Sequence, residues 1–136
     1  MDDKSLVKKA FAAMENSYAP YSNFKVGAAL LAKSKNVYTG CNVENAAFGP
    51  TNCAERTAFF KAISEGEREF EKIAIVGGLK GSVKDYCMPC GVCRQVMAEF
   101  CGADFSIIVA KDTDDYSVFT LGELLPGSFS LKNNNG

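Results

Sequence analysis

Three cysteines at the expected starts of two helices constrain this chain more than any other feature. Cys53 precedes one helical pattern, and Cys90 and Cys93 open another. A catalytic zinc ion takes three protein ligands and leaves one coordination position for water. Cys90 and Cys93 are one helical turn apart, and helix N-termini stabilise thiolates. We therefore expect the fold to bring two helix N-termini together around one Zn²⁺ ion per subunit.

Glu55 follows Cys53 by two residues and is the candidate general acid and base. It cannot easily ligate the same ion through the same turn, but it can reach a water molecule bound there. Zinc deaminases use this arrangement, in which a His-Cys₂ or Cys₃ zinc activates water and a non-ligand glutamate moves the protons. A second interpretation stays open: Asn52 lies three residues before Glu55, so the pair could form a capping box.

Cys87 leaves a competing metal hypothesis open. A four-thiolate structural zinc that includes Cys87 would close the coordination sphere and abolish hydrolysis. The spacing from Cys87 to Cys90 to Cys93 also resembles the start of an iron–sulfur motif, but Met97 stands where that motif needs its next cysteine. Because Cys87 precedes Pro89 in an extended segment, we expect its thiol to point elsewhere.

A zinc ion with three thiolates carries a net charge of −1, which weakens its ability to acidify water. A nearby cation would offset this charge. Arg56 directly follows Glu55 and Arg94 directly follows Cys93, so both are candidates to donate hydrogen bonds to the ligand sulfurs. The alternative is that both are solvated surface arginines.

Composition narrows the possible chemistry and partners. The chain has no histidine, which excludes Ser-His-Asp and Cys-His catalysis. Its net charge is −1, and no basic patch indicates nucleic-acid binding. No apolar run is long enough to span a membrane, and the N-terminus lacks the pattern of a secretion signal. We expect a cytoplasmic protein with a small-molecule partner, whose six cysteines serve metal binding or catalysis rather than disulfides.

Hydrophobic periodicity predicts one α/β domain over residues 1–136. Helices are expected at 5–18, from 51 or 52 to about 65, from 89 to about 100, and at 121–125; strands are expected at 24–32, 37–41, 72–76, 105–110 and 116–120. This order predicts a three-layer α/β/α fold, a mixed five-stranded sheet with helices on both faces. The last two strands should be antiparallel, because their connection is too short for a crossover. The tail from Leu131 is expected to fray.

Several stretches together indicate a family. They are Tyr18-Ala-Pro-Tyr-Ser22, Phe24-Lys-Val-Gly-Ala28, Gly40-Cys-Asn-Val-Glu-Asn-Ala46, Cys53-Ala-Glu-Arg-Thr57, Pro89-Cys-Gly-Val-Cys-Arg-Gln95 and Glu123-Leu-Leu-Pro-Gly127. Through them the chain resembles the small homotetrameric zinc-dependent cytidine deaminases along nearly its whole length. The resemblance implies a cytidine deaminase-like fold, a homotetramer, and hydrolysis of cytidine and deoxycytidine to uridine and deoxyuridine with release of ammonia, in pyrimidine salvage.

The same resemblance implies roles for further residues. Asn42 and Glu44 match residues that bind the ribose hydroxyls, and Phe24 matches one that packs on the pyrimidine. Phe129 resembles a C-terminal aromatic that closes the pocket of a neighbouring subunit, and the backbone of Ala54 is expected to orient water or the amine. From the residues alone, Asn42 and Glu44 could instead organise the turn after the second strand, and Phe24 could belong to the core.

Three other functions stay open. The first is deamination of another small nucleoside such as blasticidin S, against which Asn42 and Glu44 argue. The second is a polynucleotide deaminase, which the absence of a basic groove opposes. The third is a non-catalytic zinc or iron–sulfur module, which a four-sulfur coordination shell would support.

Overall fold

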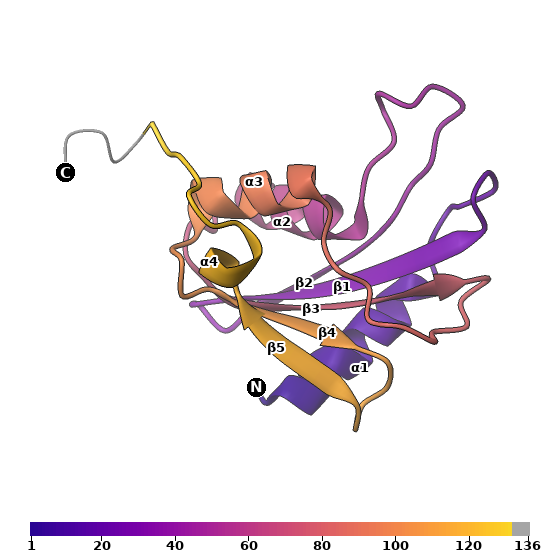
Figure 1. Ribbon diagram of the computed structural model, residues 1–136, viewed down its shortest axis with the longest axis horizontal. Helices are drawn as coiled ribbons and strands as arrows, with labels where there is room; N and C mark the ends of the chain where they lie inside the picture. The colour runs from indigo at the N-terminus through magenta and orange to yellow at the C-terminus, as the bar shows by residue number, and fades with distance from the viewer. Residues whose placement is uncertain (132–136) are drawn as a thin grey trace.

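The computed structural model describes residues 1–131, and the expected frayed tail at 132–136 lies outside the described residues. These residues form one five-stranded sheet with strand order β2-β1-β3-β4-β5 and helices on both faces (Figure 1). The architecture is the predicted mixed α/β/α arrangement. None of the described helices is long and apolar enough to cross a membrane. The elements are α1 (Asp3–Met14), β1 (Phe24–Ala32), β2 (Val37–Cys41), α2 (Ala54–Ser64), β3 (Phe70–Leu79), α3 (Gly91–Phe100), β4 (Ser106–Ala110), β5 (Tyr116–Thr120) and α4 (Leu121–Leu124).

Helix α1 begins and ends earlier than its periodicity predicts. Asp2 caps it, because its carboxylate accepts the backbone N–H of Ser5 at 2.8 Å. Beyond the helix, Tyr18 pairs its backbone with the segment after β2: its N–H donates to Asn42 O at 3.0 Å, and its carbonyl accepts from Glu44 N at 2.8 Å. The residues expected to extend α1 therefore support the loop that carries Asn42 and Glu44.

Strand β3 is longer than the predicted strand at 72–76. It pairs antiparallel with β1 from Phe24 opposite Leu79 to Ala32 opposite Phe70, with one register shift between Leu31 and Ala32. Backbone groups of β1 therefore pair with β3 beyond both ends of the predicted strand. Strands β1 and β2 form the expected antiparallel hairpin. Strands β3 and β4 are parallel and are joined through α3, whereas β4 and β5 are antiparallel.

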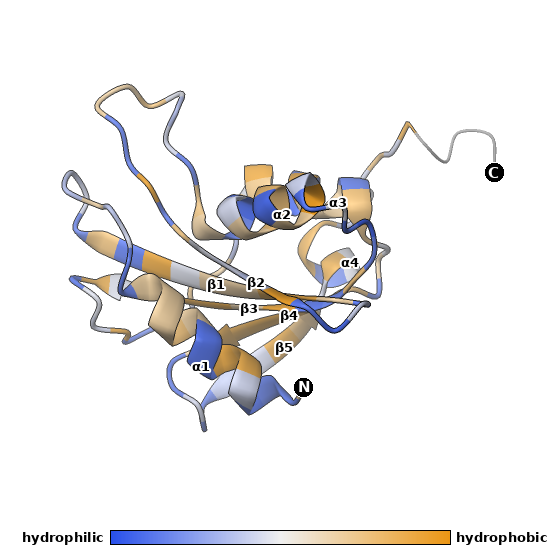
Figure 2. Ribbon diagram, turned by 180° about the vertical axis from the view of Figure 1, so that it is seen from behind, coloured by the Kyte–Doolittle hydropathy of each residue, from blue (hydrophilic) through white to orange (hydrophobic). Residues whose placement is uncertain are grey.

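The strands divide the core into two layers. Successive residues of a strand point to opposite faces, so Leu30 faces α2 and α3 while Leu31 faces α1. Figure 2 shows hydrophobic strand segments between the two helical layers. Each fully buried Leu or Ile contributes about 1.5–3 kcal/mol relative to an exposed position. The second layer contains Leu6, Val7, Ala10 and Met14 of α1 and Ala29, Leu31, Ala74, Val76, Ile108 and Ala110 of the sheet.

Helix α2 packs closely against β2 at Gly40. A Cβ atom at Gly40 would lie 2.6 Å from Ala58 N and would also overlap Ala54 O, both in the backbone of α2. The absence of a side chain at Gly40 therefore sets how near the start of α2 lies to the sheet.

Candidate metal and substrate site

The N-termini of α2 and α3 meet at three thiols. Cys53 and Cys90 are the N-cap residues of these helices, and Cys93 lies in the first turn of α3. The Cys53 and Cys90 sulfurs are 3.7 Å apart, the Cys90 and Cys93 sulfurs 3.4 Å, and all three lie within 4.8 Å of one another. The structure thus brings together all three predicted metal ligands from two separate segments.

The donor set fits a zinc ion. Zn–S bonds of about 2.3 Å in tetrahedral geometry place ligand sulfurs about 3.8 Å apart, close to the observed spacings. The Cys93 N–H also donates to Cys90 Sγ at 3.5 Å, as a helix N-terminus does for an anion. Hydrogen bonds from Cys93 and Arg56 lower the pKa of the Cys53 thiol to about 5, which favours the thiolate that binds metal.

Cys87 does not join this cluster. Within residues 1–131, one group of side chains has the spacing of metal ligands. It consists of Cys53, Cys90 and Cys93, without Cys87. Burial also raises the pKa of the Cys87 thiol to about 12. The four-sulfur structural site therefore lacks its fourth ligand in this conformation.

Of the two arginines expected beside the sulfurs, only Arg56 makes a hydrogen bond to one. Arg56 Nη2 donates to Cys53 Sγ at 3.2 Å, and Arg56 Nε is buried without a partner in the described part of the chain. A negatively charged metal–thiolate centre would offset the cost of that unpaired donor. The prediction for Arg94 was wrong: its Nε donates to Pro89 O at 2.8 Å and its Nη1 to Leu124 O at 2.7 Å. Arg94 links the start of α3 to α4.

Glu55 is the one charged side chain that is buried among the described residues, with 5% of its surface exposed. Burial raises the pKa of its carboxyl group to about 7, and the charge on Cys53 acts in the same direction. The capping-box interpretation was wrong, because Cys53 rather than Thr51 or Asn52 is the N-cap and makes no side-chain cap bond. Glu55 instead lines a cavity.

This cavity has a volume of about 250 Å³, near the lower end of the range for small-molecule pockets. The metal-binding cluster lies at one of its walls, with Cys53, Glu55 and Cys90 in the lining. The remaining lining residues are Ser22, Phe24, Val26, Asn42, Glu44, Thr51, Asn52, Ala54, Cys87 and Met88. Four of the five predicted substrate residues, Phe24, Asn42, Glu44 and Ala54, therefore border one space beside the thiols.

Asn42 and Glu44 are held in the cavity lining mainly by hydrogen bonds with backbone groups. Asn42 Nδ2 donates to Phe24 O at 2.8 Å, and Asn42 Oδ1 accepts from Val26 N at 2.9 Å. Glu44 Oε1 accepts from Tyr21 N at 2.9 Å and Ser22 N at 3.1 Å, and Oε2 accepts from the Ser22 hydroxyl.

These bonds agree with a role in organising the turn, but they do not use all the capacity of the two side chains. The Asn42 amide keeps one N–H donor, and a carboxylate such as that of Glu44 has about four acceptor positions, of which three are occupied. The hydrogen bonds from Ser22 lower the pKa of Glu44, so it remains an anion. The pair can therefore accept from and donate to a ligand with adjacent hydroxyl groups.

Phe129 stands apart from this cavity. It follows α4, it is 68% exposed, and it does not line the cavity. The sequence did not identify several other residues as part of the cavity. These are Ser22, Val26, Thr51, Asn52, Cys87 and Met88. The signal for Ser22 was present in the stretch from Tyr18 to Ser22, but a short polar loop does not reveal which carboxylate it binds.

The fold and the site together define the class: a zinc-binding α/β/α protein with a Cys₃ cluster and a non-ligand glutamate, the arrangement of zinc-dependent deaminases. Residues 1–109 match the family described as the cytidine and deoxycytidylate deaminase zinc-binding region. The chain belongs to this family.

Individual relatives agree with this assignment. A cytidine deaminase of Halalkalibacterium halodurans is 50% identical over 135 residues, which is 99% of each chain. A cytidine deaminase of Sporosarcina psychrophila is 48% identical over 130 residues, 96% of this chain and 93% of that one. The crystal structure of cytidine deaminase from Burkholderia pseudomallei superposes with a TM-score of 0.87 at 46% identity, covering 95% of this chain and 100% of that one.

Proposed function

We propose that this protein hydrolyses cytidine and deoxycytidine to uridine and deoxyuridine with release of ammonia. The observation that carries the proposal is the buried carboxyl group of Glu55 beside a cluster of three thiols, at the wall of a cavity of about 250 Å³. The relatives named cytidine deaminase support the same substrate class.

The zinc ion would be held by Cys53, Cys90 and Cys93, and it would supply the Lewis acidity that lowers the pKa of water from about 16 toward about 7. Glu55 accepts a proton from the attacking water and delivers it to N3 of the pyrimidine ring. The new C–O bond forms at C4, which becomes tetrahedral. Glu55 then takes the remaining proton of the added hydroxyl group and passes it to the amino group, so the C4 carbonyl forms as the C–N bond breaks and ammonia leaves. Burial of Glu55 excludes water that would compete for these protons.

The remaining site residues bind and orient the substrate in this proposal. Asn42 and Glu44 hold the ribose hydroxyls with the hydrogen-bonding capacity that their backbone contacts leave free. Phe24 packs on the pyrimidine, and the backbone at Ala54 orients the water or the leaving amine. Arg56 offsets the negative charge of the three thiolates through its hydrogen bond to Cys53.

The proposed assembly is a homotetramer in which Phe129 closes the cavity of a neighbouring subunit. The exposed position of this aromatic residue after α4 supports such a role, since an isolated subunit leaves it in water. A cytoplasmic place in pyrimidine salvage is consistent with six free cysteines, which a reducing compartment preserves.

The direct test is incubation of purified, metal-analysed protein with cytidine, deoxycytidine and, separately, blasticidin S. We expect uridine or deoxyuridine and one ammonia per turnover from the first two substrates, measured by chromatography and an ammonia assay. Turnover of blasticidin S alone would replace the proposed substrate, and zinc-loaded protein that deaminates none of them would refute the proposal.

A further inference from the structure

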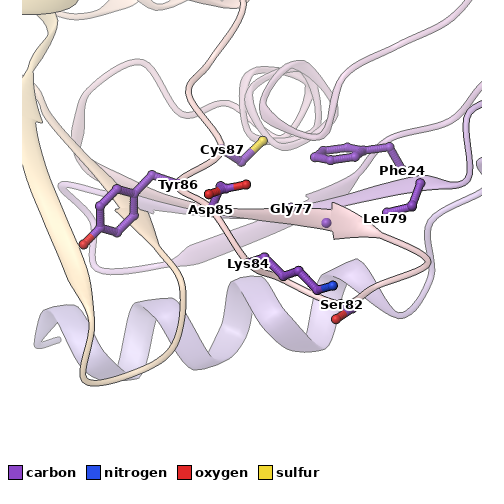
Figure 3. Close-up of a pocket in the computed structure, with 9 residues that line it drawn as sticks. Phe24, Gly77, Leu79, Ser82, Lys84, Asp85, Tyr86 and Cys87 are labelled. Atoms are coloured by element: carbon purple, nitrogen blue, oxygen red, sulfur yellow. The ribbon is translucent and has the colours of Figure 1, made fainter.

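A second cavity of about 300 Å³ borders the substrate cavity. The two cavities share Phe24 and Cys87 in their linings. In the close-up of this second cavity, the Cys87 thiol and the Phe24 ring lie on the same side of Gly77 (Figure 3). These two side chains therefore form the partition between the two spaces.

Gly77 leaves room for this partition. An ideal Cβ atom at Gly77 would lie 2.8 Å from Cys87 Sγ and 3.1 Å from both Cys87 Cβ and Phe24 Cε1. Real Cβ contacts essentially never fall below 3.0 Å, so any side chain at Gly77 would displace the thiol. The φ angle of Gly77 is not in the left-handed region, and space rather than backbone conformation requires the glycine.

The Phe24 ring has limited support of its own. It is 39% exposed and stands at the start of β1, so the core alone does not hold it. Cys87 is a half-buried thiol, and sulfur makes favourable contacts with aromatic rings.

We propose that Gly77 and Cys87 are positioning residues: Cys87, seated on the bare backbone of Gly77, fixes the Phe24 ring in the wall of the substrate cavity. The inference rests on the proposed function, in which Phe24 packs on the pyrimidine. A wall that contacts the base equally in the ground state and the transition state acts on KM rather than on kcat.

The Cys87→Ala variant tests the support. Removal of the sulfur lets the ring move toward the second cavity, so we expect KM for cytidine to rise about three- to tenfold. We expect kcat to stay within about twofold of wild type and the zinc content to be unchanged, because Cys87 is outside the metal cluster. A general structural defect would instead lower kcat, the zinc content or both.

The Gly77→Ala variant tests whether Cys87 needs the space above the backbone of Gly77. Its added methyl group pushes the thiol and the ring into the substrate cavity and should raise KM at least as strongly as Cys87→Ala. In the double variant the 2.8 Å contact with the sulfur no longer exists, and only the looser 3.1 Å contacts remain. The fold increase of KM in the double variant should therefore be smaller than the product of the fold increases in the two single variants.

Two matched controls isolate the effect. Gly49→Ala adds a methyl group where nothing lies within 4 Å, and Cys41→Ala removes a thiol from a different cavity. Both should keep wild-type KM and kcat. Steady-state kinetics, zinc content and Tm are measured for every variant, and Cys87→Ala alone decides the matter if Gly77→Ala does not fold.

Three results would overturn the inference: a wild-type KM for Cys87→Ala, a fall in kcat at constant KM, or single-variant effects that multiply in the double variant. Failure of the proposed function is a different observation. If the proposed function is wrong, the wild-type protein forms no uridine. If only the inference is wrong, the wild-type protein is active and the variants depart from the expected kinetic pattern.

Discussion

At the scale of single residues, the first turn of α2 places two neighbouring charged side chains in different surroundings. Glu55 is buried and lines the cavity, and its pKa is raised to about 7 by burial. Arg56 donates to Cys53 on the metal cluster. Adjacent positions on a helix point in different directions, so one residue can serve proton transfer while the next serves the ligand.

The Glu55→Gln variant should bind zinc as wild type does and lose about 10²- to 10⁴-fold in kcat. The amide has a similar shape but cannot carry the proton between water, ring and leaving amine. Stopped assays for uridine and atomic absorption for zinc measure the two quantities. Near-normal turnover by zinc-loaded Glu55→Gln protein would show that another group moves the protons.

The Arg56→Ala variant should lose about 10- to 100-fold in activity, because the Cys53 thiolate loses a charge-assisted hydrogen bond. Arg68→Ala is the matched control, since the Arg68 guanidinium binds only the carbonyls of Ile63 and Glu67 at an exposed position. Competition with a zinc chelator measures metal affinity alongside kcat. Unchanged activity of Arg56→Ala would discard its charge-offsetting role.

At the scale of elements, the site depends on how two helices approach the sheet. Helix α2 contacts β2 at Gly40, and α3 is tied to α4 by Arg94 through Pro89 and Leu124. The contacts at Gly40 and at Pro89 thus fix the N-terminal end of each helix, where its cysteines lie. A shift of one helix relative to the other would separate the sulfurs.

The Gly40→Ala variant should lower both Tm and zinc affinity, because its methyl group overlaps the backbone of α2 near Ala54 and Ala58. Gly27→Ala is the matched control: it overlaps α1 at Ala10 and Met14, on the other face of the sheet. We expect Gly27→Ala to lower Tm by a similar amount, with a smaller loss of zinc affinity. Equal losses of zinc affinity would mean that general destabilisation, rather than the position of α2, controls metal binding.

At the scale of the whole molecule, the metal cluster connects segments that are distant in the chain. Cys53 follows the first two strands, whereas Cys90 and Cys93 follow β3. A ligand that binds only the folded arrangement stabilises it by mass action. A zinc ion held by these three thiols would therefore serve both stability and the proposed chemistry.

Removal of zinc with a strong chelator should abolish activity and lower Tm by about 5 °C or more, and addition of zinc should restore both. Differential scanning calorimetry follows Tm, and Cys53→Ser protein is the control whose Tm the chelator should change least. A chelated protein that keeps full activity would remove the metal from the proposed mechanism.

Co-expression of Phe129→Ala with the inactive Glu55→Gln variant tests the proposed role of Phe129 between subunits. Phe129→Ala protein should have a higher KM, because its cavities lack the closing aromatic residue. Co-expressed with Glu55→Gln protein, Phe129→Ala subunits should recover a lower KM, since the partner supplies an intact Phe129. Light scattering gives the oligomeric state, and a mixed assembly that gains nothing would place Phe129 outside its neighbour's site.

Local patterns determined most of the elements and the metal ligands. Strand β5 ends where alternation and turn residues predict, and Cys53, Cys90 and Cys93 were recognisable because ligand spacing at helix starts is a property of short segments. The order of elements was enough to predict the mixed sheet. These features depend on residues close together in the chain, whose geometry the backbone periods dictate.

Only the tertiary structure decided which long-range contacts form. Strand β3 extends to Leu79 because β1 lies beside it, Arg94 reaches backbone carbonyls rather than sulfur, and Cys87 sits over Gly77 instead of joining the other thiols. No local pattern contains this information, because each of these contacts depends on the distance between segments far apart in sequence. The sequence by itself determined which groups could meet, and packing of α2 and α3 against one face of the sheet decided which of them do.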